Sequence, residues 1–258
     1  VLITANSIVV PLTGHWRLAF VTYGVVALAA TMAWWLLARD KTILEPHSSE
    51  DGERLLDMRS ETAISRHILA GLLRERNVRL VLLLSFACFF LNHGLNNWLP
   101  TILQDKGMSP DRAGFWASIP SFASIAGLII IPMVARYGYR AWAVALLFAW
   151  SSVSIAGIAF IDGGVLLGVV LVVSGFSRSP LMPMLILVLM DTHAVGHRRM
   201  GIASGMFFTI AEIGGFSGPF LMGVIRDLNG TLFSGLLLLS IMAAVFGVCA
   251  LLISERRI

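Results

Sequence analysis

The sequence predicts an all-α protein, a polytopic bundle of membrane-spanning helices. Of its 258 residues, 57% are hydrophobic, and the mean hydropathy is +0.83. Charged residues make up only 13% of the chain, about half the share found in soluble domains. Several apolar runs also approach or exceed the roughly 20 residues that a helix needs to cross a bilayer. A soluble globular class is therefore excluded.

The first part of the chain predicts the end of one helical half and a connecting loop. Val1–Leu12 has the composition of the tail of a membrane helix, and Leu18–Leu37 is apolar on every side, which favours a span that faces lipid. Residues 39–79 form the one long polar segment. We therefore expect three parts, at 1–38, 39–79 and 80–258. Because no charged region precedes the apolar start, we also expect the sequence to be a piece of a longer protein.

The last part of the chain predicts six further spans, which with Leu18–Leu37 makes seven. The predicted ranges are Leu80–Leu103, Arg112–Val134, Ala141–Ile161, Val165–Met190, Gly201–Ile225 and Thr231–Ile253. Apolar residues at 64, 68, 69, 72 and 73 fit one helical face, so the end of the polar loop is expected to lie on the membrane surface.

The basic residues predict the orientation of these spans. One side would hold the long loop and the arginines at 136, 140, 198, 199, 256 and 257, and the other only Arg17, Lys106, Arg112 and Arg226. Because cytoplasmic loops carry an excess of Lys and Arg, we expect the long loop and the C-terminus to be cytoplasmic in a multi-pass membrane protein.

A polar stripe interrupts the apolar run Leu80–Leu103. Asn92 and Asn96 are four residues apart, as are His93 and Asn97, so they form two adjacent columns on a helix at mid-membrane depth. Polar groups in hydrocarbon are costly unless they face protein or water. The stripe is either a set of contacts between helices or the lining of a substrate pathway.

Two ionisable residues, Arg178 and Glu212, lie near the middle of consecutive predicted spans. An isolated charge at that depth costs at least about 2.5–3.5 kcal/mol, so pairing or contact with water is expected. The two form either a structural ion pair or a site in which Arg178 binds an anionic substrate and Glu212 serves as counter-ion or proton acceptor.

The span that carries Arg178 is expected to kink. Pro180 and Pro183 follow the arginine and remove backbone donors, and interrupted helices near the midplane are typical of transporter sites. Ser174 lies one turn before Arg178 and is expected to share its ligand. The candidate substrate-binding residues are Asn92, His93, Asn96, Asn97, Ser174 and Arg178.

Glycine spacing and polarity predict how the spans pack. Gly201-x-x-x-Gly205 and Gly214-x-x-x-Gly218 would let helix backbones approach closely. Among the last six spans the third and sixth carry no charge and suit contact with lipid. The recurrence suggests two units of three helices.

No pattern in the sequence predicts an enzyme. It contains no nucleophile elbow, phosphate loop or paired catalytic carboxylates. His193 and His197 stand beside Asp191, but Gly196 between them favours a solvated loop over a metal site. Cys88 and Cys249 lie in apolar runs and are expected to be small core residues. We expect no cofactor, no metal and no nucleic-acid partner.

These features together resemble the major facilitator superfamily over essentially the whole chain. The resemblance rests first on the position of the long loop and on the three-plus-three pattern of helices. The stretch Arg136 to Arg140 is similar to the family's cytoplasmic loop motif, with Ala135 in place of its acid. The stretch Gly214 to Pro219 is similar to the family's Gly-Pro packing motif. Asn96 to Pro100 and Gly107 to Pro110 look similar to the cyanate and nitrate branch. The resemblance implies the C-terminal six-helix half plus the end of the N-terminal half.

Such a protein would be a secondary active transporter working by alternating access. From the buried charges we expect proton-coupled movement of a small anion by the intact protein. The alternative among transporters is a member of the same superfamily that exports drugs or metabolites. The alternative outside the transporters is a membrane receptor or scaffold that does not transport.

Overall fold

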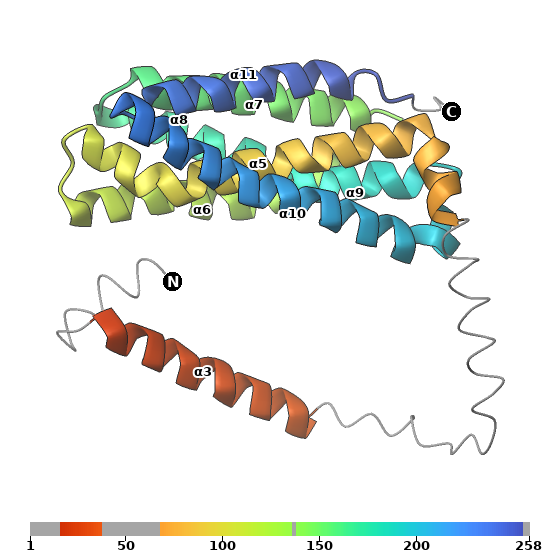
Figure 1. The fold of residues 1–258 in the computed structure, drawn as a ribbon, viewed down its shortest axis with the longest axis horizontal. Coiled ribbons are helices and arrows are strands. Elements are labelled where there is room, and N and C mark those ends of the chain that lie inside the picture. The colour runs from red at the N-terminus through yellow and green to blue at the C-terminus, as the bar shows by residue number, and fades with distance from the viewer. Residues whose placement is uncertain (1–15, 38–67, 136–137, 255–258) are drawn as a thin grey trace. The chain divides into compact units, whose positions relative to one another are not determined.

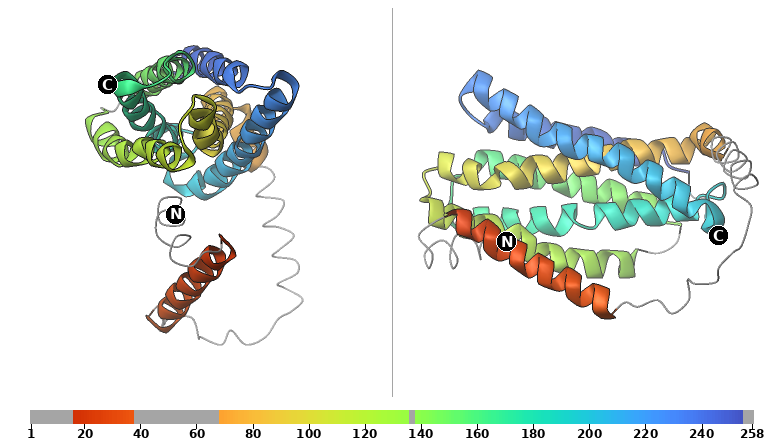
Figure 2. Two further views of the ribbon diagram at one scale, coloured as in Figure 1. Left: turned by 90° about the vertical axis from the view of Figure 1, so that its left-hand side faces the viewer. Right: turned by 60° about the horizontal axis from the view of Figure 1, so that its bottom comes forward.

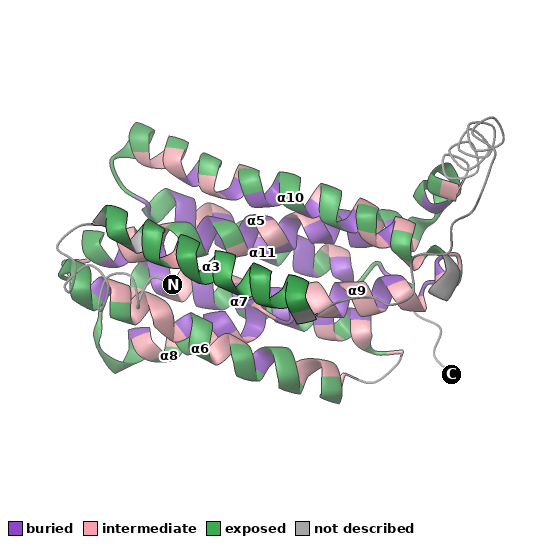
Figure 3. Ribbon diagram, turned by 90° about the horizontal axis from the view of Figure 1, so that it is seen from below, coloured by how far each residue is buried: buried purple, intermediate pink, exposed green. Residues whose placement is uncertain are grey.

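The computed structural model describes residues 16–37, 68–135 and 138–254, which fall into two units. The first unit contributes one described helix, α3 (Trp16–Leu37). Almost all of its described side chains are exposed, as Figure 3 shows in green. A helix that is apolar on all sides suits a lipid environment. The predicted helix tail Val1–Leu12 and most of the polar segment lie outside the described residues.

The second unit is a bundle of helices (Figure 1). A helical stretch at 68–74 is followed by α5 (Arg76–Asp105), α6 (Pro110–Val134) and α7 (Arg140–Phe160). Then come α8 (Gly164–Arg178), α9 (Leu181–Asp191), α10 (Gly196–Asn229) and α11 (Phe233–Ala250). In the stretch at 68–74, Leu72 is fully buried whereas Leu69 and Leu73 are exposed.

Six spans in the described residues are long and apolar enough to cross a membrane, with α8 and α9 together making one of them. Helix α3, which is 22 residues long, corresponds to the remaining predicted span, Leu18–Leu37, and contains the apolar stretch Phe20–Leu36. The predicted break beside Arg178 is present: α8 ends at that residue, and α9 begins only after Ser179 and Pro180.

Helix α5 is the centre of the bundle. It contacts α6, α8, α9, α10 and α11, and the view along the bundle in Figure 2 (left) shows it inside the ring that the others form. Its buried residues include Leu84, Leu91, Leu95 and Leu99. Most side chains in the middle of α5 therefore have another helix of this unit beside them.

The main helix contacts repeat between two sets of three. Helix α5 packs on α10, α6 packs on the α8 segment, and α7 packs on α11. The first helix of each set thus pairs with the second of the other, and the third helices pair with each other. This is the pairing expected for two units of three helices. Between α7 and α11, Ser152 and Ser240 exchange hydrogen bonds with each other's carbonyl oxygens at 2.8 and 2.9 Å.

Glycines set the close approach in two of these pairs. A Cβ on Gly214 or Gly218 would collide with the carbonyl oxygens of Phe86 and Phe90 on α5, and a Cβ on Gly175 would collide with the backbone of Pro120 on α6. The packing predicted for Gly214-x-x-x-Gly218 is therefore confirmed. The other pair, Gly201 and Gly205, has open space where a Cβ would stand. That pair does not pack in this unit, because it lies on an exposed face of α10.

Candidate functional site

Arg178 is the largest fully buried polar side chain of the bundle, with 2% of its surface exposed. It is the last residue of α8, just before the break that the prolines impose, and thus projects from a helix end near the middle of the span Gly164–Asp191. Burial of a guanidinium at this depth requires hydrogen-bond acceptors around it.

Three neutral side chains supply those acceptors. The Nε of Arg178 donates to Ser174 Oγ at 3.1 Å, one turn back on α8. Its Nη1 donates to Asn92 Oδ1 at 3.3 Å and its Nη2 to Asn96 Oδ1 at 3.0 Å, both on α5. The structure thus brings together four of the six predicted site residues, from two helices that are far apart in the sequence.

Asn92 is itself fixed in place. Its Nδ2 donates to the carbonyl oxygen of Cys88 at 3.0 Å and lies 3.4 Å from the carbonyl oxygen of Arg178. The amide orientation is therefore set so that its oxygen faces the guanidinium. The apolar run around Cys88 predicts only a core residue, and its position one turn before Asn92 is the signal in the sequence for this further role.

Glu212 does not pair with Arg178. The ion pairs of the described residues join Lys106 to Asp162, Arg140 to Asp191 and Arg226 to Asp105, and none includes Arg178. The predicted structural ion pair is thus absent from the described residues. The reason is geometric: Glu212 is exposed on α10, whereas Arg178 takes its acceptors from α5 and α8.

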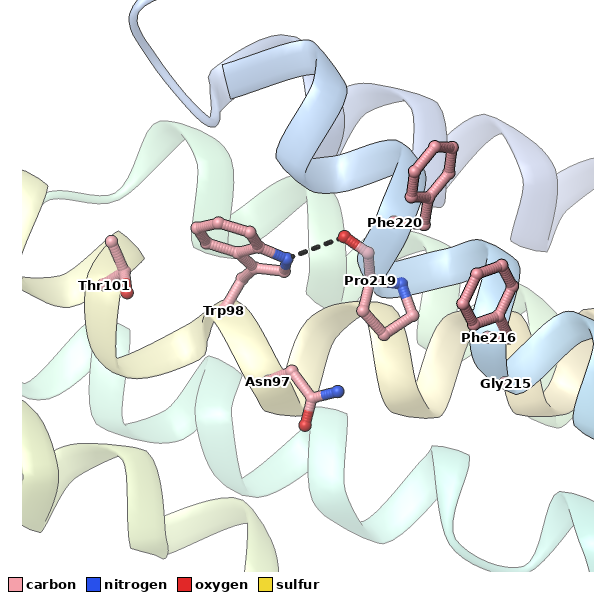
Figure 4. A pocket seen from close by; sticks show the side chains of 7 residues that line it. All are labelled: Asn97, Trp98, Thr101, Gly215, Phe216, Pro219 and Phe220. Carbon is pink, nitrogen blue, oxygen red and sulfur yellow. Dashed lines mark hydrogen bonds between the residues drawn. The ribbon is translucent and has the colours of Figure 1, made fainter. Parts of the chain in front are cut away.

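His93 and Asn97 form the second column of the stripe and face α10 instead. The ring of His93 stacks on Phe89, with centroids 5.6 Å apart, and lies beside Gly215. Asn97 lines an open pocket of about 610 Å³ between α5 and α10 (Figure 4). The two columns therefore serve different helices: Asn92 and Asn96 face Arg178, and the other two face α10.

Aromatic side chains line the pocket in Figure 4 from both helices, Trp98 from α5 and Phe216 and Phe220 from α10. Trp98 donates from Nε1 to the carbonyl oxygen of Pro219 at 3.0 Å, and the guanidinium of Arg226 lies 5.5 Å from the centre of its ring. Across the pocket, Phe216 and Phe220 stack with centroids 5.8 Å apart. The sequence alone does not distinguish these aromatic residues, because single exposed rings are common on membrane helices.

Comparison with known proteins agrees with this architecture. The profile of the Major Facilitator Superfamily matches residues 3–219. The chain belongs to the Major Facilitator Superfamily. With six apolar spans among its described residues, it is a multi-pass membrane protein of this superfamily.

Relatives within the superfamily carry different substrate names. A quinolone resistance transporter of Acinetobacter baumannii is 28% identical over 66% of this chain and 39% of its own length. A protein of Agrobacterium vitis named for tartrate transport is 30% identical over 74% of this chain and 44% of its own length. The hexuronate transporter of Bacillus subtilis is 25% identical over 94% and 58%. The chain thus spans about half the length of these relatives.

Proposed function

We propose that the chain is part of a secondary active transporter that moves a small organic anion, with Arg178 as the anion contact and protons as the coupling ion. One observation carries the proposal: a guanidinium at mid-depth is buried among neutral acceptors, with no carboxylate paired to it among the described residues. A charge in that position is stable only when something compensates it.

The geometry of Arg178 suits a carboxylate. A guanidinium has five N–H donors, and the described residues take one from each of its three nitrogens. The remaining two belong to Nη1 and Nη2, the pair that binds both oxygens of a carboxylate. Tartrate and hexuronates, which appear in the names of two relatives, are carboxylate anions.

Access to Arg178 requires movement, because its side chain is 2% exposed. The break between α8 and α9 offers the place for it. Ser179 and Pro180 separate the two helices directly beside the arginine, and half-helices that meet at the midplane are the usual sites of substrate binding in alternating-access transporters.

Export of planar aromatic compounds is the second candidate function. The stacked Phe216 and Phe220 beside the amide of Asn97 favour it, and two relatives are named for quinolone resistance and for 2-nitroimidazole. A receptor or scaffold that does not transport remains the alternative outside the class, and it predicts that Arg178 can be changed without loss of function.

Ligand-dependent stabilisation of the purified protein, expressed from its full reading frame, separates these alternatives. Glucuronate, tartrate, a quinolone and a quaternary ammonium dye are added, and the unfolding temperature is recorded. A ligand at about 100 times its Kd adds roughly 2.7 kcal/mol, a shift of a few degrees. Stabilisation by the two acids supports the proposal, whereas stabilisation by the dye alone contradicts it.

A further inference from the structure

The described bundle contains a second set of ionisable groups at mid-depth that the anion site does not use. His93 on α5 and Glu212 on α10 both lie near the centres of their helices, and both side chains are exposed. A carboxylate that faced hydrocarbon at this depth would carry a cost of several kcal/mol. This surface of α5 and α10 is therefore expected to face water or protein.

Gly215 is what lets the two side chains approach. A Cβ on Gly215 would lie 3.4 Å from Glu212 Oε2 and 3.4 Å from His93 Cδ2, so the carboxylate and the imidazole flank the same small space. The imidazole of His93 also stacks on the ring of Phe89. The ring of Phe89 in turn contacts Phe208 edge-on. A carboxylate and an imidazole across one gap can share a proton directly or through one water molecule.

We infer that His93 and Glu212 form the proton-binding site of the transporter, separate from the anion site at Arg178. The inference rests on the proposed function, since it assigns residues to its coupling ion. The two sites are joined through α5, because Asn92, which accepts from Arg178, and His93 are consecutive residues on adjacent columns of the stripe.

Charge balance gives the coupling its physical reason. With His93 neutral, Arg178 and Glu212 sum to zero, and an anion bound to Arg178 changes that sum to minus one. One proton on Glu212 or His93 restores it, so each ligand favours the binding of the other.

Few other charges face this surface. Near mid-depth, the ionisable residues of the described bundle are Cys88, His93, Glu212 and Arg178, which ends α8 at the break in its span. Helices α6 and α9 contribute charges only at their ends, and α11 has none. Near the ends of α5 and α10 lie Arg76, Arg79, Asp105, Arg199, Arg226 and Asp227.

Two transport assays in proteoliposomes test the assignment. Exchange of labelled glucuronate at equal pH needs no net proton movement, whereas accumulation driven by an inward proton gradient does. We expect Glu212→Gln to keep exchange within about twofold and to lose accumulation by at least about tenfold, as one missing proton site requires. His93→Gln should also lower accumulation more than exchange.

Gly215→Ala provides a test that leaves both ionisable groups in place. Its methyl group would make ordinary contacts with its neighbours, so the protein should fold, but it would separate the carboxylate from the imidazole. We expect reduced accumulation with exchange retained. Glu75→Gln is the matched control, because this exposed carboxylate precedes α5 outside the bundle core, and it should behave as wild type in both assays.

The outcomes separate the two proposals. Normal accumulation in Glu212→Gln overturns the proton site, and loss of both assays in that variant would move Glu212 to the anion site instead. Arg178→Lys should lose both exchange and accumulation. If that variant retains both activities, the proposed anion contact is wrong, whereas the result for Glu212 still stands. If the wild type exchanges neither glucuronate nor tartrate, the proposed anion transport itself is wrong.

Discussion

At the scale of single residues, the described site depends on neutral oxygens that hold a buried cation. Ser174, Asn92 and Asn96 each give Arg178 one acceptor. Such bonds to a charged group are worth about 1.5–3 kcal/mol each, but they leave the positive charge in place. These hydrogen bonds therefore stabilise the buried side chain of Arg178, and its positive charge can still attract an anion.

Ser174→Ala should destabilise the protein, because it leaves the buried Nε of Arg178 without its acceptor. We expect a loss of about 1–3 kcal/mol and weaker binding of acid anions. Ser154→Ala is the control: that hydroxyl is also buried, but it donates to the carbonyl oxygen of Ser151 in its own helix. Thermal unfolding of both variants in detergent measures the difference, and equal losses would contradict the role of Ser174.

The sequence allowed the members of the stripe to be predicted, but not their partners. Helical spacing places Asn92 with Asn96 and His93 with Asn97. Which column faces which helix depends on the rotation of α5 in the bundle, and that rotation is set by Gly214 and Gly218 on α10. The sequence therefore favoured Glu212 as the partner of Arg178, although the α8 break and the position of α5 give Arg178 other acceptors.

At the scale of helices, small residues determine which faces meet. Gly214 and Gly218 bring α10 onto α5, and Gly175 with Gly127 brings α8 onto α6. The positions of the helices were predictable from apolar runs to within a few residues. The open surroundings of Gly201 and Gly205 were not, because the same spacing occurs whether or not a neighbour is present.

Gly218→Ala should weaken the contact between α10 and α5, since its methyl group would meet the carbonyl oxygen of Phe90. Overpacking of this kind costs about 1–3 kcal/mol. Gly205→Ala has open space and should gain up to about 1 kcal/mol from helix propensity. Unfolding temperatures of the two variants test this, and equal stability would show that the close approach is dispensable.

At the scale of the whole molecule, polar side-chain contacts join neighbouring helix ends of the bundle into two groups. Lys106 binds Asp162 at 3.0 Å, and Arg226 lies 3.5 Å from Asp105. Arg140 binds Asp191 at 2.6 Å, and Asn77 bonds the backbone of Ser254. These two groups match the two sides that alternation of the spans predicts. The first carries the sparse basic residues, and the second adjoins the polar segment.

The positive-inside rule then predicts that the polar segment is cytoplasmic. In a background that lacks Cys88 and Cys249, a cysteine at Ser49 should resist a membrane-impermeant maleimide added to intact cells. A cysteine at Gly163, which lies between α7 and α8 in open surroundings, should react. Labelling at Ser49 from outside would reverse the orientation.

Uptake of an acid anion by variants of Arg178, normalised to folded protein, tests most directly whether this arginine is the anion contact. We expect Arg178→Lys to lower uptake by about 10- to 100-fold, as loss of one charge-assisted hydrogen bond implies. The double change Arg178→Ala with Glu212→Ala should stay inactive, because no ion pair joins them among the described residues. Normal uptake in the double variant would show that Arg178 is a structural partner of Glu212 and not the anion contact.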